Sequence, residues 1–330
     1  RQHTMRHTSK LIASLLLAVP GLLLGPAQAQ TDDYPNRAIT MIVPFPAGGP
    51  TDIVARLMAK QMGDQMGQSI VVENRGGASG TIGMQAAVNA KPDGYTILYN
   101  TSSIALSTIL YKNLSYNPEK DFAAVTSTAT VPMVLLAHPS VPANNIKEFI
   151  DYANKNPGKL SYASSGAGNV THLTAFLFSQ SANIDAVHVP YRGSAPAMID
   201  LVGGQVDYMT NTLNDSLQFV RDGRLKALAI TTADRSEQLP DVPTLAETVM
   251  PGFESGAWQG IVAPTGTPEA IINRLNEEAL KALQSDEVKS QLDQQGTQIL
   301  GSTPAEYQAY ISSEIVRWGK VIEAAGVSLD

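Results

Sequence analysis

Short runs of β-branched and other apolar residues alternate with helix-patterned segments along most of the chain, and this alternation narrows the choice of fold more than any other feature. In the first unit, residues 38–43 form an apolar run, and residues 51–66 carry apolar side chains at the spacing of one helix face. Strands that alternate with helices are typical of a mostly parallel sheet covered by helices on both faces. The sequence therefore predicts an α/β protein.

The same alternation predicts the remaining elements. The expected strands after the first unit are residues 70–73, 95–99, 160–163, 186–189, 206–209 and 225–231. The expected helices are residues 84–89, 146–154, 170–181, 194–202, 213–221, 268–284, 286–295 and 304–324. Residues 74–82 are rich in glycine and are expected to form a turn.

Two longer extended segments, residues 122–137 and 256–263, interrupt the alternation. We expect them to carry the chain into a second lobe and back. The first lobe would then contain residues 30–125 and 262–330, and the second lobe residues 126–261. Two lobes joined by two crossings enclose a hinged cleft, and ligands of open α/β sheets bind at the carboxyl ends of the strands.

The first residues have the pattern of a secretory signal peptide. Arg6 and Lys10 precede an apolar run, residues 11–24, and a small-residue cleavage site follows at residues 27–29. The run is short and interrupted for a membrane-spanning helix, although an uncleaved anchor is an alternative. We therefore expect residues 5–29 to be a signal peptide and the rest of the chain to be exported to the periplasm.

The composition excludes several classes of function. Three of the 23 Lys and Arg residues precede residue 30, so the exported part would carry 20 of them against 30 Asp and Glu, and nucleic-acid binding is not expected. The chain has no cysteine, which excludes disulfides, thiolate zinc sites and cysteine nucleophiles. His138, His172 and His188 do not pair at metal-ligand spacing, so we expect neither a metal nor a cofactor.

Two turns of small residues, residues 44–52 and 164–169, each lead from a predicted strand into a helix start. A helix N-terminus offers unpaired N–H groups and the positive end of the helix dipole, and glycine lets an anion approach the main chain. Both turns are candidate anion cradles, and an ordinary helix start is the alternative for the first. The candidate ligand residues are Ala47, Gly48, Gly49, Thr51 and Asp52 in the first turn and Ser164, Ser165, Gly166, Asn169 and His172 in or just after the second.

Other polar residues follow predicted strands. Arg192 lies between a strand and a helix, where its guanidinium group can contact a carboxylate through two nitrogens, although most surface arginines do not. Asn211 follows the strand at residues 206–209, so its amide can donate to a ligand oxygen. A further polar loop offers hydroxyl donors and consists of Asn100, Thr101, Ser102 and Ser103.

Enzymatic functions have weaker support. Neither residues 77–80 nor residues 164–168 form the G-x-S-x-G elbow of a serine hydrolase, and residues 76–83 match no nucleotide-binding loop. His172 could serve a nearby serine as a base, but no orienting acid is evident, and a solvated or capping histidine is the simpler interpretation. We therefore expect no enzyme, and a hydrolase or isomerase that uses His172 is the alternative.

Several short motifs follow one another between residues 34 and 268. They are Tyr34-Pro-Asn-Arg37, Pro44-Phe-Pro-Ala-Gly-Gly-Pro-Thr-Asp52, Val72-Glu-Asn-Arg75 with Gly80 and Gly83, Pro92-Asp-Gly-Tyr95, Val189-Pro-Tyr-Arg-Gly193, Gly203-Gly-Gln-Val-Asp207, Leu239-Pro-Asp-Val-Pro-Thr244 and Ala263-Pro-Thr-Gly-Thr-Pro268. In these motifs and their order the chain resembles the Bug family of periplasmic solute receptors, which serve tripartite tricarboxylate transporters.

The resemblance implies a type II periplasmic-binding-protein fold whose two lobes close on a small carboxylate. In that family the loops that match residues 46–52 and 164–169 hold a carboxylate, partly through ordered waters. Many members have an aspartate where this chain has Asn211. The neutral amide disfavours an amino-acid ligand and favours a dicarboxylate or an aromatic acid.

The resemblance also implies partners. We expect a monomer that delivers its ligand to membrane transporter subunits. A sensor component that presents the bound ligand to a membrane signalling protein is the alternative.

Overall fold

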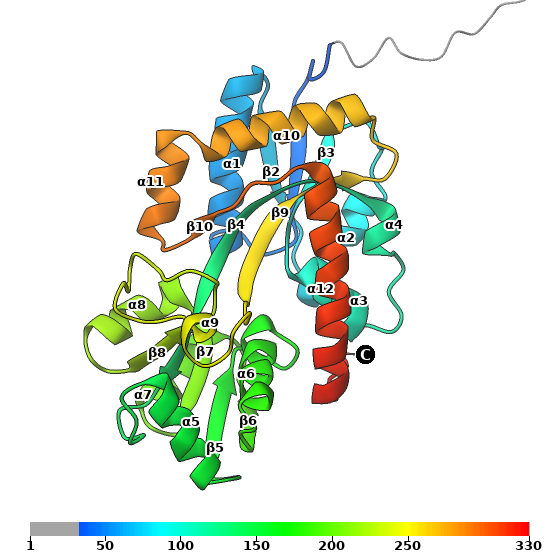
Figure 1. The fold of residues 1–330 in the computed structure, drawn as a ribbon. Helices are drawn as coiled ribbons and strands as arrows, with labels where there is room; N and C mark the ends of the chain where they lie inside the picture. The colour runs from blue at the N-terminus through cyan, green and yellow to red at the C-terminus, as the bar shows by residue number, and fades with distance from the viewer. Residues whose placement is uncertain (1–32, 330) are drawn as a thin grey trace, which may run out of the picture.

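The structure is a computed structural model and describes residues 33–329; the predicted signal peptide lies outside the described residues. Figure 1 shows two α/β halves joined by two long strands, β4 (Phe122–Ala137) and β9 (Gly256–Pro264). We call the half that contains the N-terminal strands lobe 1 and the other half lobe 2. The last helix, α12 (Pro304–Ala325), begins beside lobe 1 and extends toward lobe 2.

Lobe 1 is built from the first and last parts of the chain. Its strand β1 (Ile39–Val43) pairs in parallel with β2 (Ile70–Asn74) and β3 (Thr96–Thr101). The remaining elements of this half are α1 (Pro50–Met66), η1 (Ala78–Gly80), α2 (Thr81–Val88), α3 (Ser103–Leu110), α4 (Pro118–Asp121), α10 (Glu269–Leu283), α11 (Asp286–Gln294) and β10 (Gln298–Ile299).

Lobe 2 is built from the middle of the chain. Its strand β5 (Leu160–Ser164) pairs in parallel with β6 (Ala186–Pro190) and β7 (Tyr208–Thr212). The remaining elements are α5 (Ile146–Lys155), α6 (Val170–Ser181), α7 (Ser194–Val202), α8 (Leu213–Arg221), β8 (Lys226–Ile230) and α9 (Leu245–Thr248).

Strand β4 belongs to both lobes. Residues 122–132 pair with β9 and residues 133–137 pair with β7, antiparallel in each case, and β9 pairs antiparallel with β3. The strand order is therefore β2-β1-β3-β9-β4-β7-β5-β6. The expectation of a mostly parallel sheet was wrong, because the two strands that connect the lobes run opposite to their neighbours.

Helices cover both faces of the sheet in each lobe, as the alternation predicts. In lobe 1, side chains of α1 and α10 such as Met58 and Leu275 pack on one face, while Met84 of α2 and Tyr307 of α12 pack on the other. In lobe 2, Phe149 of α5 and Leu201 of α7 lie in the cores on opposite faces. These cores fix the strands, whose ends carry the loops that face the other lobe.

Several boundaries differ from the sequence prediction near the carboxyl ends of strands. β3 continues through Asn100 and β7 continues through Asn211, because both residues still pair with neighbouring strands, opposite Gly260 and Val134. Helix α3 was not predicted, since its small and apolar residues lack a polar face. Within residues 33–329, no helix has the length and apolar character required to cross a membrane.

Candidate functional site

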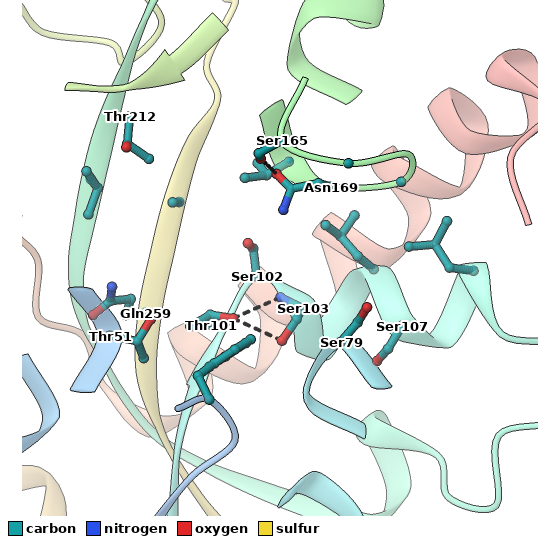
Figure 2. Close-up of a pocket in the computed structure, with 18 of the residues that line it drawn as sticks. Thr51, Ser79, Thr101, Ser102, Ser103, Ser107, Ser165, Asn169, Thr212 and Gln259 are labelled. Atoms are coloured by element: carbon teal, nitrogen blue, oxygen red, sulfur yellow. Dashed lines mark hydrogen bonds between the residues drawn. The ribbon is translucent and has the colours of Figure 1, made fainter. Parts of the chain in front are cut away.

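A cavity of about 420 Å³ lies between the lobes. Its lining residues come from both halves and from the two connecting strands (Figure 2). The polar members are Thr51, Ser79, Thr101, Ser102, Ser103, Ser107, Ser165, Asn169, Thr212, Asn214 and Gln259, and the others are Phe45, Leu106, Leu110, Val131, Gly166, Ala167, Gly168, Val170, Ala257 and Leu329. The cavity is large enough for a small organic molecule.

The structure places some of the candidate residues on the cavity lining and others outside it. The candidates that line the cavity are Thr51, Thr101, Ser102, Ser103, Ser165, Gly166 and Asn169. The candidates that do not line it are Ala47, Gly48, Gly49, Asp52, Asn100, Ser164, His172, Arg192 and Asn211.

Asn169 is the N-cap of α6, and this role orients its amide. Its Oδ1 accepts hydrogen bonds from the Thr171 N–H, at 2.9 Å, and from the Ser165 hydroxyl, at 3.0 Å. Its Nδ2 group has no acceptor in the described part of the chain, and Figure 2 shows it directed toward Ser102 of lobe 1. Because the oxygen is held by the cap, the two N–H groups of the amide are presented to the cavity.

Neutral side chains support the loop of residues 164–169, which we call the cavity loop. Ser164 is fully buried, and its hydroxyl lies 2.7 Å from Nε2 of His188. Nδ1 of His172 accepts a hydrogen bond from the Gly168 N–H at 3.0 Å, which places the ring proton of a neutral His172 on Nε2. The two imidazole rings stack with their centres 3.6 Å apart. Burial and the neighbouring His188 lower the pKa of His172 to about 4, so the ring is neutral at pH 7.

This arrangement leaves His172 poorly placed for catalysis. Its ring is 4% exposed and is absent from the cavity wall. Its Nδ1 is occupied by a main-chain N–H, and it is the neighbouring His188 that contacts Ser164. The ring therefore positions the loop of residues 164–169.

In lobe 1, the loop of residues 44–52 is held by an ionised carboxylate. Asp52 is 2% exposed and accepts hydrogen bonds from the Gly48 N–H at 2.8 Å, from Arg56 Nε at 2.9 Å and from Asn74 Nδ2 at 2.8 Å. Burial alone would raise the pKa of Asp52, but these hydrogen bonds outweigh it and lower the pKa. The Gly48 N–H is therefore occupied within the loop, and Thr51 is the one candidate of this loop that lines the cavity in the described chain.

The loop after β3 contributes hydroxyl groups. Ser102 donates its N–H to the Trp258 carbonyl, and its hydroxyl has no partner in the part of the chain that the structure describes. The hydroxyls of Thr101 and Ser103 lie 2.9 Å apart and hydrogen-bond to each other. Asn100 instead points into lobe 1, where its amide donates to the Tyr307 hydroxyl at 2.8 Å.

Arg192 and Asn211 are not among the residues that line the cavity, and their surroundings differ. Arg192 is exposed, and its neighbours Tyr191 and Gly193 donate their N–H groups to the carbonyls of Ser164 and Ser165. Asn211 is 1% exposed and donates from Nδ2 to the Ser194 hydroxyl at 2.9 Å. The segment around Arg192 therefore supports the cavity loop, while Asn211 supports the start of α7.

Sequence reasoning missed several polar residues of the cavity. Thr212 and Asn214 stand at the end of β7 and the start of α8, and Gln259 lies on β9 with its Oε1 accepting from the Tyr99 hydroxyl at 2.9 Å. The rule that strand ends carry ligand contacts would have found Thr212, had the end of β7 been placed correctly. Asn214 has a buried Oδ1 without a hydrogen-bond partner among residues 33–329, and nothing in the local sequence marks it.

No residue that lines the cavity in the described chain carries a charged side chain. The available donors are amide, hydroxyl and main-chain N–H groups, and the lining includes Thr51 and Val170 in the first turns of α1 and α6. Hydrogen bonds from neutral donors to an ionised group are stronger than those between two neutral groups. The cavity can therefore hold a small anion without a countercharge, as helix N-termini do.

Comparison with known proteins agrees with this geometry. Residues 54–327 match the tripartite tricarboxylate transporter family receptor. BugT of Bordetella pertussis is 37% identical over 320 residues, which cover 95% of this chain and 98% of that protein. Proteins of this family are non-enzymatic solute receptors.

Two similar solved structures contain acids. A protein of R. palustris, solved with adipate, is 36% identical with a TM-score of 0.76, and the match covers 90% of this chain and 99% of that one. MatC of Rhodopseudomonas palustris, solved with bound malate, is 36% identical with a TM-score of 0.72, and the match covers 88% and 100% of the two chains. This chain belongs to the tripartite tricarboxylate transporter receptor family, the Bug family of periplasmic binding proteins.

Proposed function

We propose that this protein is exported to the periplasm, captures a small carboxylate between its two lobes and delivers it to a tripartite tricarboxylate-type membrane transporter. The observation that carries the proposal is the uncharged cavity, in which donors from both lobes face one another. Asn169 offers its amide from lobe 2, and Ser102 and Thr51 offer hydroxyls from lobe 1 (Figure 2).

The adipate and malate complexes of the two R. palustris proteins support a carboxylate as the ligand. We propose a dicarboxylate or an aromatic carboxylate. The proposal of this ligand class does not depend on Asn211, because its amide donates to the Ser194 hydroxyl and does not line the cavity. The choice rests on the cavity itself, which combines several hydroxyl groups with aliphatic side chains and the aromatic ring of Phe45.

Closure of the lobes would exclude water from the cavity. Electrostatic interactions strengthen when water is removed, so neutral donors that bind an anion weakly in solvent hold it more firmly inside a closed cleft. Strands β4 and β9 connect the lobes, and we propose that bending at this connection opens and closes the cleft.

Titration calorimetry with a panel of aliphatic dicarboxylates, aromatic carboxylates and amino acids tests the proposal. We expect acids to bind, with affinity lowered about tenfold in Ser165→Ala, which removes the hydroxyl that orients the Asn169 amide. Arg192→Ala should change binding little, since the segment supports the loop through the main-chain N–H groups of Tyr191 and Gly193.

Ser290→Ala on the exposed face of α11 is the matched control and should bind as the wild type does. Binding of none of the acids, or binding of amino acids alone, would contradict the proposed ligand class. Uptake of labelled ligand by cells with and without the protein separates delivery to a transporter from presentation to a signalling protein. Recovery of the ligand unchanged after incubation separates both from an enzyme.

A further inference from the structure

One wall of the cavity is apolar and is formed by three segments that lie far apart in the sequence. Leu106 and Leu110 come from α3, Val170 is the first residue of α6, and Leu329 follows α12. All four belong to one apolar cluster, which also contains Trp318 of α12. Because α3 belongs to lobe 1 and α6 to lobe 2, this cluster spans the cleft.

Local geometry directs the segment after α12 into this wall. The helix ends at Gly326, whose φ of 66° is the left-handed conformation of a helix C-cap, and the chain turns there. The Leu329 N–H then donates to the Leu110 carbonyl at 3.0 Å. The side chain of Leu329 is thereby held beside α3, where it lines the cavity.

The cavity loop of lobe 2 packs directly on the same segment. A Cβ atom at Gly168 would lie 3.1 Å from a δ-carbon of Leu110 and 3.4 Å from a γ-carbon of Val327. The next residue is Asn169, whose amide is the donor that faces the cavity. A carboxylate bound at Asn169 would therefore have the apolar wall next to it.

We propose that Leu329, with Leu106, Leu110 and Val170, forms the subsite for the apolar body of the ligand. The receptor would then prefer carboxylates that carry an alkyl or aryl group over hydroxylated acids, because apolar surface gains free energy when it leaves water. This inference rests on the proposed carboxylate-binding function and narrows its ligand class.

Calorimetry with benzoate and malate, on the wild type and on Leu329→Ser, tests the subsite. We expect the wild type to bind benzoate at least tenfold more tightly than malate. Leu329→Ser should weaken benzoate binding about tenfold and change malate binding less than twofold, since malate gains little from an apolar wall. Val316→Ser is the matched control, because Val316 is 62% exposed on α12 and lies outside the cavity wall.

The outcomes separate this inference from the proposed function. If neither benzoate nor malate nor any other acid binds the wild type, the carboxylate-receptor function itself is wrong. If malate binds more tightly than benzoate, or if Leu329→Ser leaves benzoate binding unchanged, the subsite is wrong and the receptor function stands. Should Leu329→Ser fold poorly in a ligand-free thermal melt, Leu329→Ala decides in its place, with a loss of about threefold for benzoate expected.

Discussion

The two glycine-rich loops have similar sequences but are supported in different ways. The loop of lobe 1 is organised around ionised Asp52, which accepts the Gly48 N–H and pairs with Arg56. The loop of lobe 2 is organised around neutral His172, which accepts the Gly168 N–H. In both loops a side chain of the first helical turn holds the main chain of the preceding turn.

The difference in charge matches a difference in exposure to the cavity. A carboxylate that faced the cavity would repel an anionic ligand, and Asp52 is instead buried and hydrogen-bonded behind the loop. In lobe 2 the neutral support allows residues 165–170 to line the cavity continuously. Residues 165–169 of the lobe 2 loop line the cavity, whereas from residues 44–52 of lobe 1 the described cavity lining includes Phe45 and Thr51.

Removal of the Asp52 carboxylate is expected to have the largest effect on stability. Asp52→Ala removes the acceptor of the Gly48 N–H and one acceptor each of Arg56 and Asn74, at a cost of roughly 3–4 kcal/mol in the free energy of unfolding. Denaturant unfolding measures this loss. Asp64→Ala, at an exposed position of the same helix, should cost less than about 0.5 kcal/mol. Equal losses in the two variants would show that Asp52 does not organise its loop.

Acidification is expected to destabilise the loop of lobe 2 through His172. The pKa of this histidine is lowered from 6.5 to about 4 in the folded protein, so the unfolded chain binds more protons between these values. The contribution of His172 to the free energy of unfolding is therefore fully present above pH 6.5 and decreases as the pH falls toward 4. From this residue we expect a loss of roughly 2 kcal/mol between pH 7.5 and pH 5.

Urea unfolding at the two pH values measures this loss. His172→Asn provides the comparison, because its side-chain oxygen can accept from the Gly168 N–H but does not titrate in this range. The variant should lose less stability on acidification than the wild type. The same pH dependence in both proteins would contradict the role assigned to His172.

Disturbing the contact between the loop of residues 164–169 and α3 is expected to have a smaller effect on stability. Gly168 has a φ of 75° and lies against Leu110 and Val327, whereas Gly223 has a φ of 71° with open space around it. In both Gly→Ala variants the left-handed conformation lowers the stability. In Gly168→Ala the added methyl group also crowds Leu110 and Val327. Thermal melts should therefore show Gly168→Ala to be less stable than Gly223→Ala by about 1 kcal/mol. Equal stabilities would indicate that the contact is loose.

The sequence predicted most of the fold because periodicity and turn residues mark elements locally. The extended segment at residues 122–137 and the helix at residues 170–181 have the bounds that the pattern predicts. The antiparallel pairing of β4 and β9 escaped prediction, since strand direction depends on which distant segments meet. The family resemblance, in contrast, drew on motifs across the whole chain and is confirmed by the match over residues 54–327.

The cavity was predicted less completely than the fold. Composition and position pointed to Ser165 and Asn169, which do line the cavity, but also to Ser164 and His172, which lie behind it. Ser164 ends β5 and Ser165 follows it, and neighbouring residues at a strand end point to opposite sides. His172 lies inside α6, where its side chain turns back to the Gly168 N–H. Leu329 was missed because its position depends on a turn after a long helix.

The central claim is that neutral donors from lobe 2 hold a carboxylate, and Asn169→Asp tests it most directly. The substitution retains the side-chain oxygen that caps α6 but replaces the amide donor with a second, negatively charged oxygen. We predict an unchanged or slightly raised melting temperature and an affinity for the best-binding acid that falls at least 100-fold by calorimetry. An affinity within threefold of the wild type, in a protein that melts normally, would contradict the account.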